Sequence, residues 1–374
     1  MQQNTAYKPS QGLSIEDYAV DEDTISQRTF QTQFNIEPKN QVRLVKLLFM
    51  QYQVPNLDQI TIFLQDFGLS VAKSTPESRW FNGYGSEPYV YHARKGPRKF
   101  GGGAFLVETY ADLEKALKVP EAKVLSNGIE SLKDAPGGGF IVTLEDPEGF
   151  PISLVHGQQQ DQSQAQPPTQ IILNYEVKKP RVRKFQRFTQ GPAAVYRLGH
   201  YGLVIGDFQS QFAFYTRNFN IIPTSILYLE NDKSENDKGT CGDMVSESRQ
   251  NVAMFAHIDR GTELVDHHSL FLVTRPPQIH ESHVHHCSFE IHDFDTQLIG
   301  HHWMLNKNYR PAWGVGRHIL GSQIFDYWWD PNDFMVEHYI DGDVVNEDTP
   351  VSFHPAASAK DAAWGPDVPQ EFLE

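Results

Sequence analysis

The sequence predicts an α+β protein built from two tandem domains that share one plan. A chain of 374 residues is longer than a single ordinary hydrophobic core accommodates. A strand-then-helix pattern that starts at Val42 returns after Pro192, and such repetition indicates a duplicated domain. Between the copies, GQQQDQSQAQPPTQ has the composition of a flexible linker. The predicted division is an N-terminal arm over 1–40, a first domain over 41–156, a linker over 157–192, a second domain over 193–345 and a tail over 346–374.

The first half opens with a polar arm that lacks periodicity, which predicts a segment that lies across another surface or stays mobile. VRLVKLLFMQYQV then has the apolar run of a buried strand. Asn56 is a predicted helix cap, and the helix that follows places one apolar face toward the core, formed by Leu57, Ile60, Leu64 and Phe67. Short strands, a short helix around YADLEKALKV and the strands of GGGFIVTLEDPEGFPISLVHG complete this half.

The second half repeats these elements in the same order. After the strand in YRLGHYGLVI, Asp207 is the predicted cap of a helix whose apolar face carries Phe208, Phe212, Tyr215 and Phe219. HHCSFEIHDFD matches GGGAFLVETYADLE, and WWDPNDFMVEHY matches TLEDPEGFPISLVH through a shared Asp-Pro turn. Two homologous domains are therefore expected.

Charge and composition exclude several classes of protein. A net charge of -15 argues against a nucleic-acid partner, because a phosphate backbone would be repelled. No apolar run reaches the length of a membrane span. Two cysteines, Cys241 and Cys287, are too few for a disulfide framework. The N-terminal residues do not resemble a signal peptide, so we expect a soluble protein in the reducing cytoplasm.

Three residues of the second half form a candidate metal-binding set: His200, His286 and Glu337. Strand alternation in HHCSFEI and FMVEHYI lets His286 and Glu337 point to one side while their neighbours pack on the other. A carboxylate within an apolar strand is costly to bury ionised unless a positive group meets it. Two imidazoles and one carboxylate with open positions are typical of non-haem Fe(II) oxygen chemistry.

The two halves provide an internal comparison for this set. Aligned by pattern, the first half has Phe49 opposite His200, Gly102 opposite His286 and Ser153 opposite Glu337. A purely structural role would favour similar residues in both copies. Because every candidate ligand is absent from the first half, we predict that only the second half binds metal.

The residues from Val42 to Asp343 resemble the type I extradiol ring-cleaving dioxygenases of the vicinal oxygen chelate superfamily, which includes catechol 2,3-dioxygenase and homoprotocatechuate 2,3-dioxygenase. The resemblance is strongest in GRHILG, IFDYWWD and MVEHY, where His318, Tyr327 and Glu337 match in type and spacing. It implies two tandem domains, each made of paired βαβββ modules whose curved sheet encloses a pocket.

The resemblance also implies roles. His200, His286 and Glu337 would bind Fe(II), or occasionally Mn(II), and His268 in DHHSLFL would be the acid and base. His318 and Tyr327 would orient a catechol, which O2 then cleaves beside the diol to a muconic semialdehyde-type product. One position departs from the homoprotocatechuate enzymes, which have an arginine where this chain has Trp313. This difference favours an apolar ring substituent over an acetate group.

Two other functions are compatible with the residues. A metal-dependent isomerase or lyase of the same superfamily, similar to glyoxalase, would need a fourth ligand that the sequence does not reveal. A non-catalytic protein that binds an aromatic ligand would not need the proton-transfer groups. His285 and His267 precede candidate site residues and are expected to face the opposite side of their strands, in structural roles. A homodimer or homotetramer is expected, since sheet edges of this kind commonly pair.

Overall fold

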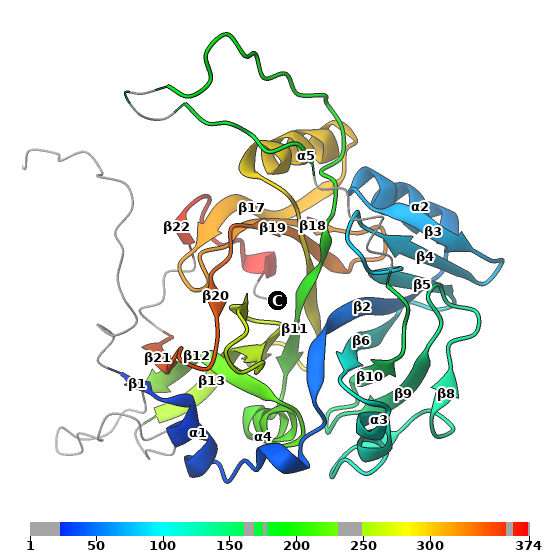
Figure 1. Ribbon diagram of the computed structural model, residues 1–374, viewed down its shortest axis with the longest axis vertical. Coiled ribbons are helices and arrows are strands. Elements are labelled where there is room, and N and C mark those ends of the chain that lie inside the picture. The colour runs from blue at the N-terminus through cyan, green and yellow to red at the C-terminus, as the bar shows by residue number, and fades with distance from the viewer. Residues whose placement is uncertain are drawn as a thin grey trace, which may run out of the picture.

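Two large sheets, one from each half of the chain, organise the computed structural model (Figure 1). It describes residues 23–160, 168–174, 177, 179–230, 249–356 and 362–372. Helices pack on the outside of the sheets, and one continuous hydrophobic core includes residues from both halves. Within the described residues, no helix has the length and apolar character needed to cross a bilayer.

The first half forms a nine-stranded sheet in which two similar units meet at β2 and β6, in the order β3-β4-β5-β2-β6-β10-β9-β7, with β8 paired to β9. Its elements are β2 (Leu44–Val54), α2 (Leu57–Asp66), β3 (Ser70–Ser74), β4 (Ser78–Asn82), β5 (Tyr91–Lys95), β6 (Lys99–Val107), α3 (Tyr110–Ala116), β7 (Lys123–Val124), β8 (Glu130–Ser131), β9 (Phe140–Glu145) and β10 (Pro151–His156).

The second half repeats this order in an eleven-stranded sheet, whose central part runs β12-β13-β15-β11-β16-β19-β18-β17. Its elements are β11 (Arg197–Ile205), α4 (Phe208–Asn218), β12 (Ile221–Glu230), β13 (Arg249–Ile258), β14 (Val265–Asp266), β15 (Leu270–Thr274), β16 (His283–Glu290), α5 (Phe294–Asn306), β17 (Arg310–His318), β18 (Ile324–Trp329), β19 (Met335–Ile340) and β20 (Val344–Val345). Each half is thus a pair of βαβββ modules, and the predicted fold class is confirmed.

The helix caps match the sequence. The Asn56 side chain accepts hydrogen bonds from the backbone N–H groups of Asp58 and Gln59 at the start of α2. Asp207 accepts from the backbone of Ser210 at the start of α4. These side chains satisfy donors that lack partners within the helix. Both apolar faces are buried as predicted, including Leu64, Phe67, Tyr215 and Phe219.

Strand register shows that the halves are equivalent residue by residue. Three neighbouring strands align three residues side by side in each half: Phe49 on β2, Ala104 on β6 and Ser153 on β10, and His200 on β11, Ser288 on β16 and Glu337 on β19. A β-bulge precedes the first member in both, between Leu47 and Phe49 and between Leu198 and His200. The register therefore reproduces the counterparts inferred from the sequence.

The described residues near each end of the chain pack on the second half. Residues 24–40 include β1 (Thr24–Ile25), α1 (Gln27–Gln33) and η2 (Pro38–Asn40), and β1 pairs with β21 (Val351–Pro355). Phe30 is fully buried against Phe212. The described part of the predicted arm therefore lies across another surface. Residues 1–22 lie outside the described residues, as does Cys241.

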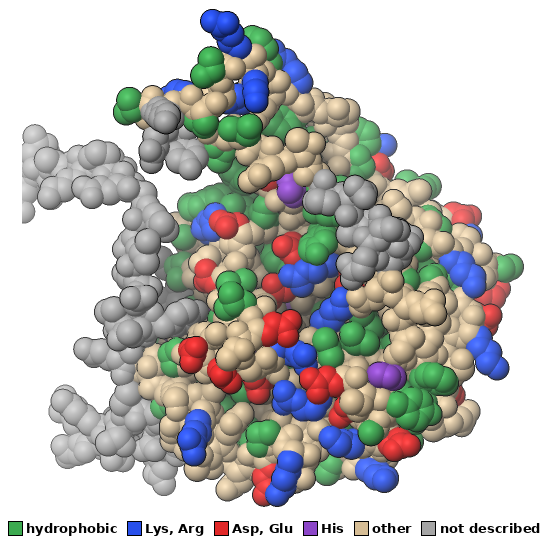
Figure 2. All heavy atoms as spheres, in the orientation of Figure 1, with side chains coloured by type: hydrophobic (Ala, Val, Ile, Leu, Met, Phe, Trp, Pro, Cys, Tyr) green, Lys and Arg blue, Asp and Glu red, His purple; other side chains and the backbone are tan. Residues whose placement is uncertain are grey.

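The C-terminal tail is also in contact with the second half. After β21, the strand β22 (Ala362–Trp364) pairs with β17, and η3 (Gln370–Phe372) follows. By contrast, the described residues between His156 and Arg197 form no helix or strand. The segment after residue 168 projects from the body, with basic and hydrophobic side chains together at its end (Figure 2). Among these, Val177, Val182 and Phe185 are exposed.

Candidate metal centre

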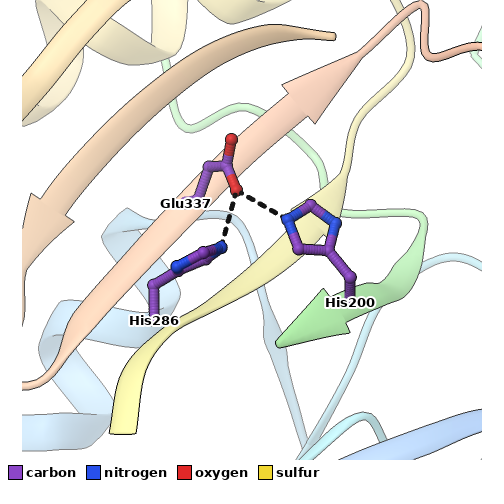
Figure 3. A group of neighbouring side chains, drawn as sticks. All are labelled: His200, His286 and Glu337. Carbon is purple, nitrogen blue, oxygen red and sulfur yellow. Dashed lines mark ion pairs between the residues drawn. The ribbon is translucent and has the colours of Figure 1, made fainter. Parts of the chain in front are cut away.

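Three adjacent strands each place one candidate ligand at the same point. His200 comes from β11, His286 from β16 and Glu337 from β19 (Figure 3). Oε2 of Glu337 lies 3.2 Å from Nε2 of His200 and 3.6 Å from Nε2 of His286. The candidate ligand atoms all lie within 4.8 Å of one another. All three residues are buried, Glu337 completely.

The unpaired polar atoms of this cluster fit a cation. Nε2 of His286 and both carboxylate oxygens of Glu337 are buried and have no hydrogen-bond partner. An ionised carboxylate in such a position is costly unless a positive charge compensates it. A divalent ion between the three groups would satisfy all three atoms, and both imidazole and carboxylate are suitable ligands. Across the described ranges, this is the one group of three or more such residues with metal-binding geometry.

His268 lies directly beside the cluster. Its ring centroid is 4.1 Å from that of His200, and its Nδ1 lies 3.2 Å from Nδ1 of His267. Burial, together with the neighbouring histidines His200 and His267, holds the pKa of His268 well below its usual value. A buried imidazole disfavours its charged form, so burial favours the neutral form of His268.

His318 and Tyr327 lie on the other side of the carboxylate. Nε2 of His318 is 3.1 Å from the Tyr327 hydroxyl and 4.0 Å from Oε1 of Glu337. Burial and the negative charge of Glu337 hold the pKa of Tyr327 well above its usual value. The tyrosine therefore keeps its proton and is a hydrogen-bond donor. Trp313 stacks on Tyr327 at 6.0 Å between ring centroids and donates its indole N–H to the carbonyl of Pro366.

A cavity of about 200 Å³ opens onto the cluster. His200, His268, His286, His318 and Tyr327 all line it. The rest of its wall is mostly apolar, and includes Val204, Leu227, Phe255, Phe271, Val273 and Leu320. None of the lining residues is a lysine, an arginine or an aspartate. The structure thus brings every candidate site residue except the buried Glu337 to one cavity wall.

The expected position of His285 was wrong. Strand alternation predicted that His285 faces away from His286, yet both line the cavity. The cause is a register shift, because β16 advances from Val284 to His286 while β11 advances only from Leu203 to Gly202. A β-bulge of this kind re-aims side chains. Burial lowers the pKa of His285 to about 4. His267 is absent from the cavity wall, as expected.

Phe372 is a cavity residue that the sequence did not reveal. It belongs to η3, and its ring lies 4.8 Å from that of Tyr327 and 4.7 Å from that of Trp313. No pattern marks it, because a single aromatic residue in a polar tail has no periodicity. The other histidines do not join the cluster. His301, for example, pairs with Asp326 at 2.9 Å, which agrees with the expected packed role.

Comparison with curated proteins found a relative that matches part of the chain. No protein-family model matches the chain. Metapyrocatechase 2 of Cupriavidus necator is 32% identical over 133 residues, which cover 34% of this chain and 38% of that protein. The match therefore spans well under half of the curated relative.

Solved structures match over most of the chain. Homoprotocatechuate 2,3-dioxygenase of Brevibacterium fuscum, in complex with 3,4-dihydroxyphenylacetate, has a TM-score of 0.68 at 19% identity, covering 89% of this chain and 92% of that one. The enzyme of the same name from Arthrobacter globiformis has a TM-score of 0.68 at 18% identity, covering 89% and 91%. A Mn(II)-bound glyoxalase of Novosphingobium aromaticivorans has a TM-score of 0.66 at 20% identity, covering 88% and 94%.

Proposed function

We propose that this chain is an Fe(II)-dependent extradiol dioxygenase of the vicinal oxygen chelate superfamily, which cleaves a substituted catechol beside the diol; the partial match to metapyrocatechase 2 and the fold shared with homoprotocatechuate 2,3-dioxygenase support this proposal. The product would be of the muconic semialdehyde type. One observation carries the proposal: two imidazoles and one carboxylate converge on a buried point beside a cavity. Mn(II) is the alternative metal, because the same ligands accept it.

Bound Fe(II) would give the two diol oxygens and dioxygen a common binding point, with both reactants held next to each other. His200, His286 and Glu337 would hold the ion from one side, since they come from three neighbouring strands. His200 and His286 also line the cavity, whose volume of about 200 Å³ accommodates a small aromatic ring.

The remaining polar residues would handle protons and orientation. Neutral His268 can take a proton from the catechol and return it later, which is general acid–base catalysis. Tyr327 keeps its proton and can donate a hydrogen bond to a diol oxygen. His318 lies 3.1 Å from the Tyr327 hydroxyl and would fix its direction.

The cavity wall supports an uncharged ring substituent. The lining residues include no lysine or arginine that could meet a carboxylate. Trp313 occupies the wall, and its one polar group is already paired with Pro366. Burying a carboxylate without a partner is costly. Alkyl- or aryl-substituted catechols therefore fit the cavity better than 3,4-dihydroxyphenylacetate.

A metal-dependent isomerase is the second candidate, because the fold also matches a Mn(II)-bound glyoxalase. Such a site would use a further protein ligand. In the described part of the chain, the metal-binding group has three members. Three protein ligands favour the dioxygenase, because its reaction requires coordination positions on the metal that the protein does not fill.

Oxygen consumption separates the two candidates. The protein is loaded with Fe(II) without air, mixed with catechol, 4-methylcatechol or 3,4-dihydroxyphenylacetate, and then exposed to oxygen. We expect one O2 consumed per ring and a yellow product, fastest with 4-methylcatechol. The Glu337→Gln variant, carried through the same loading, is the control and should consume no oxygen. Turnover of a hemithioacetal without oxygen uptake would instead establish the isomerase.

Assembly into a homodimer or homotetramer and a cytoplasmic location stay predictions from the sequence. The exposed side chains of Val177, Val182 and Phe185 on the projecting segment support the first. Light scattering of the purified protein measures the mass of the assembly directly.

A further inference from the structure

His285 links the candidate metal centre to the C-terminal end of the chain. Its Nδ1 lies 2.7 Å from Nδ1 of the neighbouring His286. Its Nε2 lies 3.0 Å from the backbone carbonyl oxygen of Phe372. The two contacts use both ring nitrogens of His285, and the bulge in β16 makes them possible by turning the ring toward the cavity.

The directions of these hydrogen bonds follow from the carbonyl. A carbonyl oxygen can only accept, so Nε2 of His285 must carry a hydrogen and donate. A neutral imidazole has one N–H, which leaves Nδ1 of His285 as an acceptor. Nδ1 of His286 must then be the donor. Its hydrogen is therefore on Nδ1, and the lone pair is on Nε2, the atom that faces Glu337.

This tautomer is the one a metal ligand requires, because the coordinating nitrogen must be unprotonated. Metal-bound histidines commonly have their second nitrogen fixed by a hydrogen-bond acceptor, which sets the ring orientation. Here that acceptor is itself a histidine, and the tautomer of that histidine is set by the tail.

We propose that His285 is a positioning residue for the metal ligand His286, and that the C-terminal segment selects its tautomer through the Phe372 carbonyl. The inference rests on the proposed metal site. It means that closure of the tail over the cavity and metal binding favour each other.

The tail is held in place well enough to have this role. Its strand β22 pairs with β17, and Trp313 donates to the carbonyl of Pro366. The Phe372 ring packs on His285 at 4.9 Å between centroids and on Tyr327 at 4.8 Å. Phe372 thus covers the cavity with its side chain and fixes His285 with its backbone.

Two substitutions distinguish the roles of the two ring nitrogens of His285. In His285→Asn, the amide oxygen takes the place of Nδ1 and can still accept from His286. In His285→Gln, the amide nitrogen takes the place of Nε2 and keeps only the contact with Phe372. His285→Leu removes both. If His285 acted only by filling space, the Mn(II) affinities of these variants would not depend on which ring nitrogen each amide group replaces.

Mn(II) affinity is the measurement, followed by the loss of the free-ion EPR signal during titration. We expect His285→Leu and His285→Gln to weaken Mn(II) binding by about 10- to 100-fold, the usual effect of removing such a partner. His285→Asn should stay close to the unmodified protein. His283→Leu replaces a half-buried histidine on the same strand whose Nδ1 contacts the carbonyl of Glu281, and this matched control should bind normally. Circular dichroism verifies that each variant is folded.

Removal of residues 370–374 tests the coupling to the tail. We expect this truncation to weaken Mn(II) binding in the unmodified protein, because His285 is then free to adopt either tautomer. It should leave the affinity of His285→Asn unchanged, since an amide oxygen accepts whether or not the tail is present.

Equal Mn(II) affinity in His285→Leu, His285→Gln and the unmodified protein would overturn the positioning role. An equal loss on truncation in the unmodified protein and in His285→Asn would overturn the coupling. Both results differ from failure of the proposed function, in which the unmodified protein itself does not bind Mn(II).

Discussion

Glu337 is a fully buried carboxylate beside the cavity. Both of its oxygens are buried without a hydrogen bond, and two histidine nitrogens lie within 3.6 Å of Oε2. His268 differs, because it contacts His200 only through its ring and has a hydrogen-bond partner in His267. The geometry thus separates residues that would hold a metal from one that would move protons.

The first prediction tests this separation at His268. In His268→Phe, the ring keeps its place but cannot exchange a proton. We expect kcat to fall by about 10²- to 10⁴-fold, the usual contribution of general acid–base catalysis, while iron content stays at the unmodified level. Elemental analysis and oxygen uptake on one preparation give both numbers. Loss of iron in His268→Phe would mean that His268 is a ligand.

At the scale of secondary structure, the three candidate ligands lie on the strands β11, β16 and β19. β11 and β16 pair at the centre of the sheet and β19 lies next to β16, so three ligands can meet without any long loop. The same arrangement in the first half brings Ser153 next to Thr143, and their hydroxyl oxygens lie 2.9 Å apart. Tyr327 stands at the position of Thr143, paired with Glu337. Both halves therefore share one backbone arrangement. They differ in the side chains at these positions, and only those of the second half are candidate metal ligands.

The second prediction concerns the start of α2. The Asn56 side chain accepts from two backbone N–H groups. Asn56→Ala should lower the free energy of unfolding by about 1 kcal/mol, the typical value of a helix N-cap. Asn56→Ser, which can cap, is the control and should restore most of it. Urea denaturation followed by far-UV circular dichroism measures the change, and an unchanged Asn56→Ala would show that water replaces the cap.

At the scale of the molecule, the two halves share one core. The Phe67 ring, just after α2, lies 3.6 Å from the ring of His338 on β19, between centroids. Nε2 of His338 donates to the Phe67 carbonyl at 2.7 Å. His338 follows the candidate ligand Glu337, so the first half supports the strand that bears it. The first half, which has no candidate metal ligand at the equivalent positions, thus supports the site by packing against β19.

The third prediction tests this shared core. Phe67→Ala should lower the free energy of unfolding by about 3–5 kcal/mol, as expected for a fully buried phenylalanine. Ile62→Ala is the control on α2, the helix that ends just before Phe67, because Ile62 is 60% exposed and should change stability little. Signals from both halves should be lost in one transition. Two separate transitions in the unmodified protein would contradict a shared core.

Much of this organisation follows from the sequence by itself. Hydrophobic periodicity and caps determine the strands and helices, because burial and unsatisfied backbone donors act over a few residues. The repeated pattern predicts the tandem domains, and the counterparts Phe49, Gly102 and Ser153 favour the second half for the proposed metal site. These inferences need only local spacing and one comparison within the chain.

Only the tertiary structure decided the orientation of His285, the place of Phe372 and the composition of the cavity wall. The bulge that turns His285 into the cavity arises from pairing between β16 and β11. The contact of Phe372 with His285 joins residues 87 positions apart. Neither leaves a periodic signal, because a register shift and a long-range contact depend on which segments meet in space. For the same reason, the absence of lysine and arginine from the cavity wall became visible only once the strands were assembled.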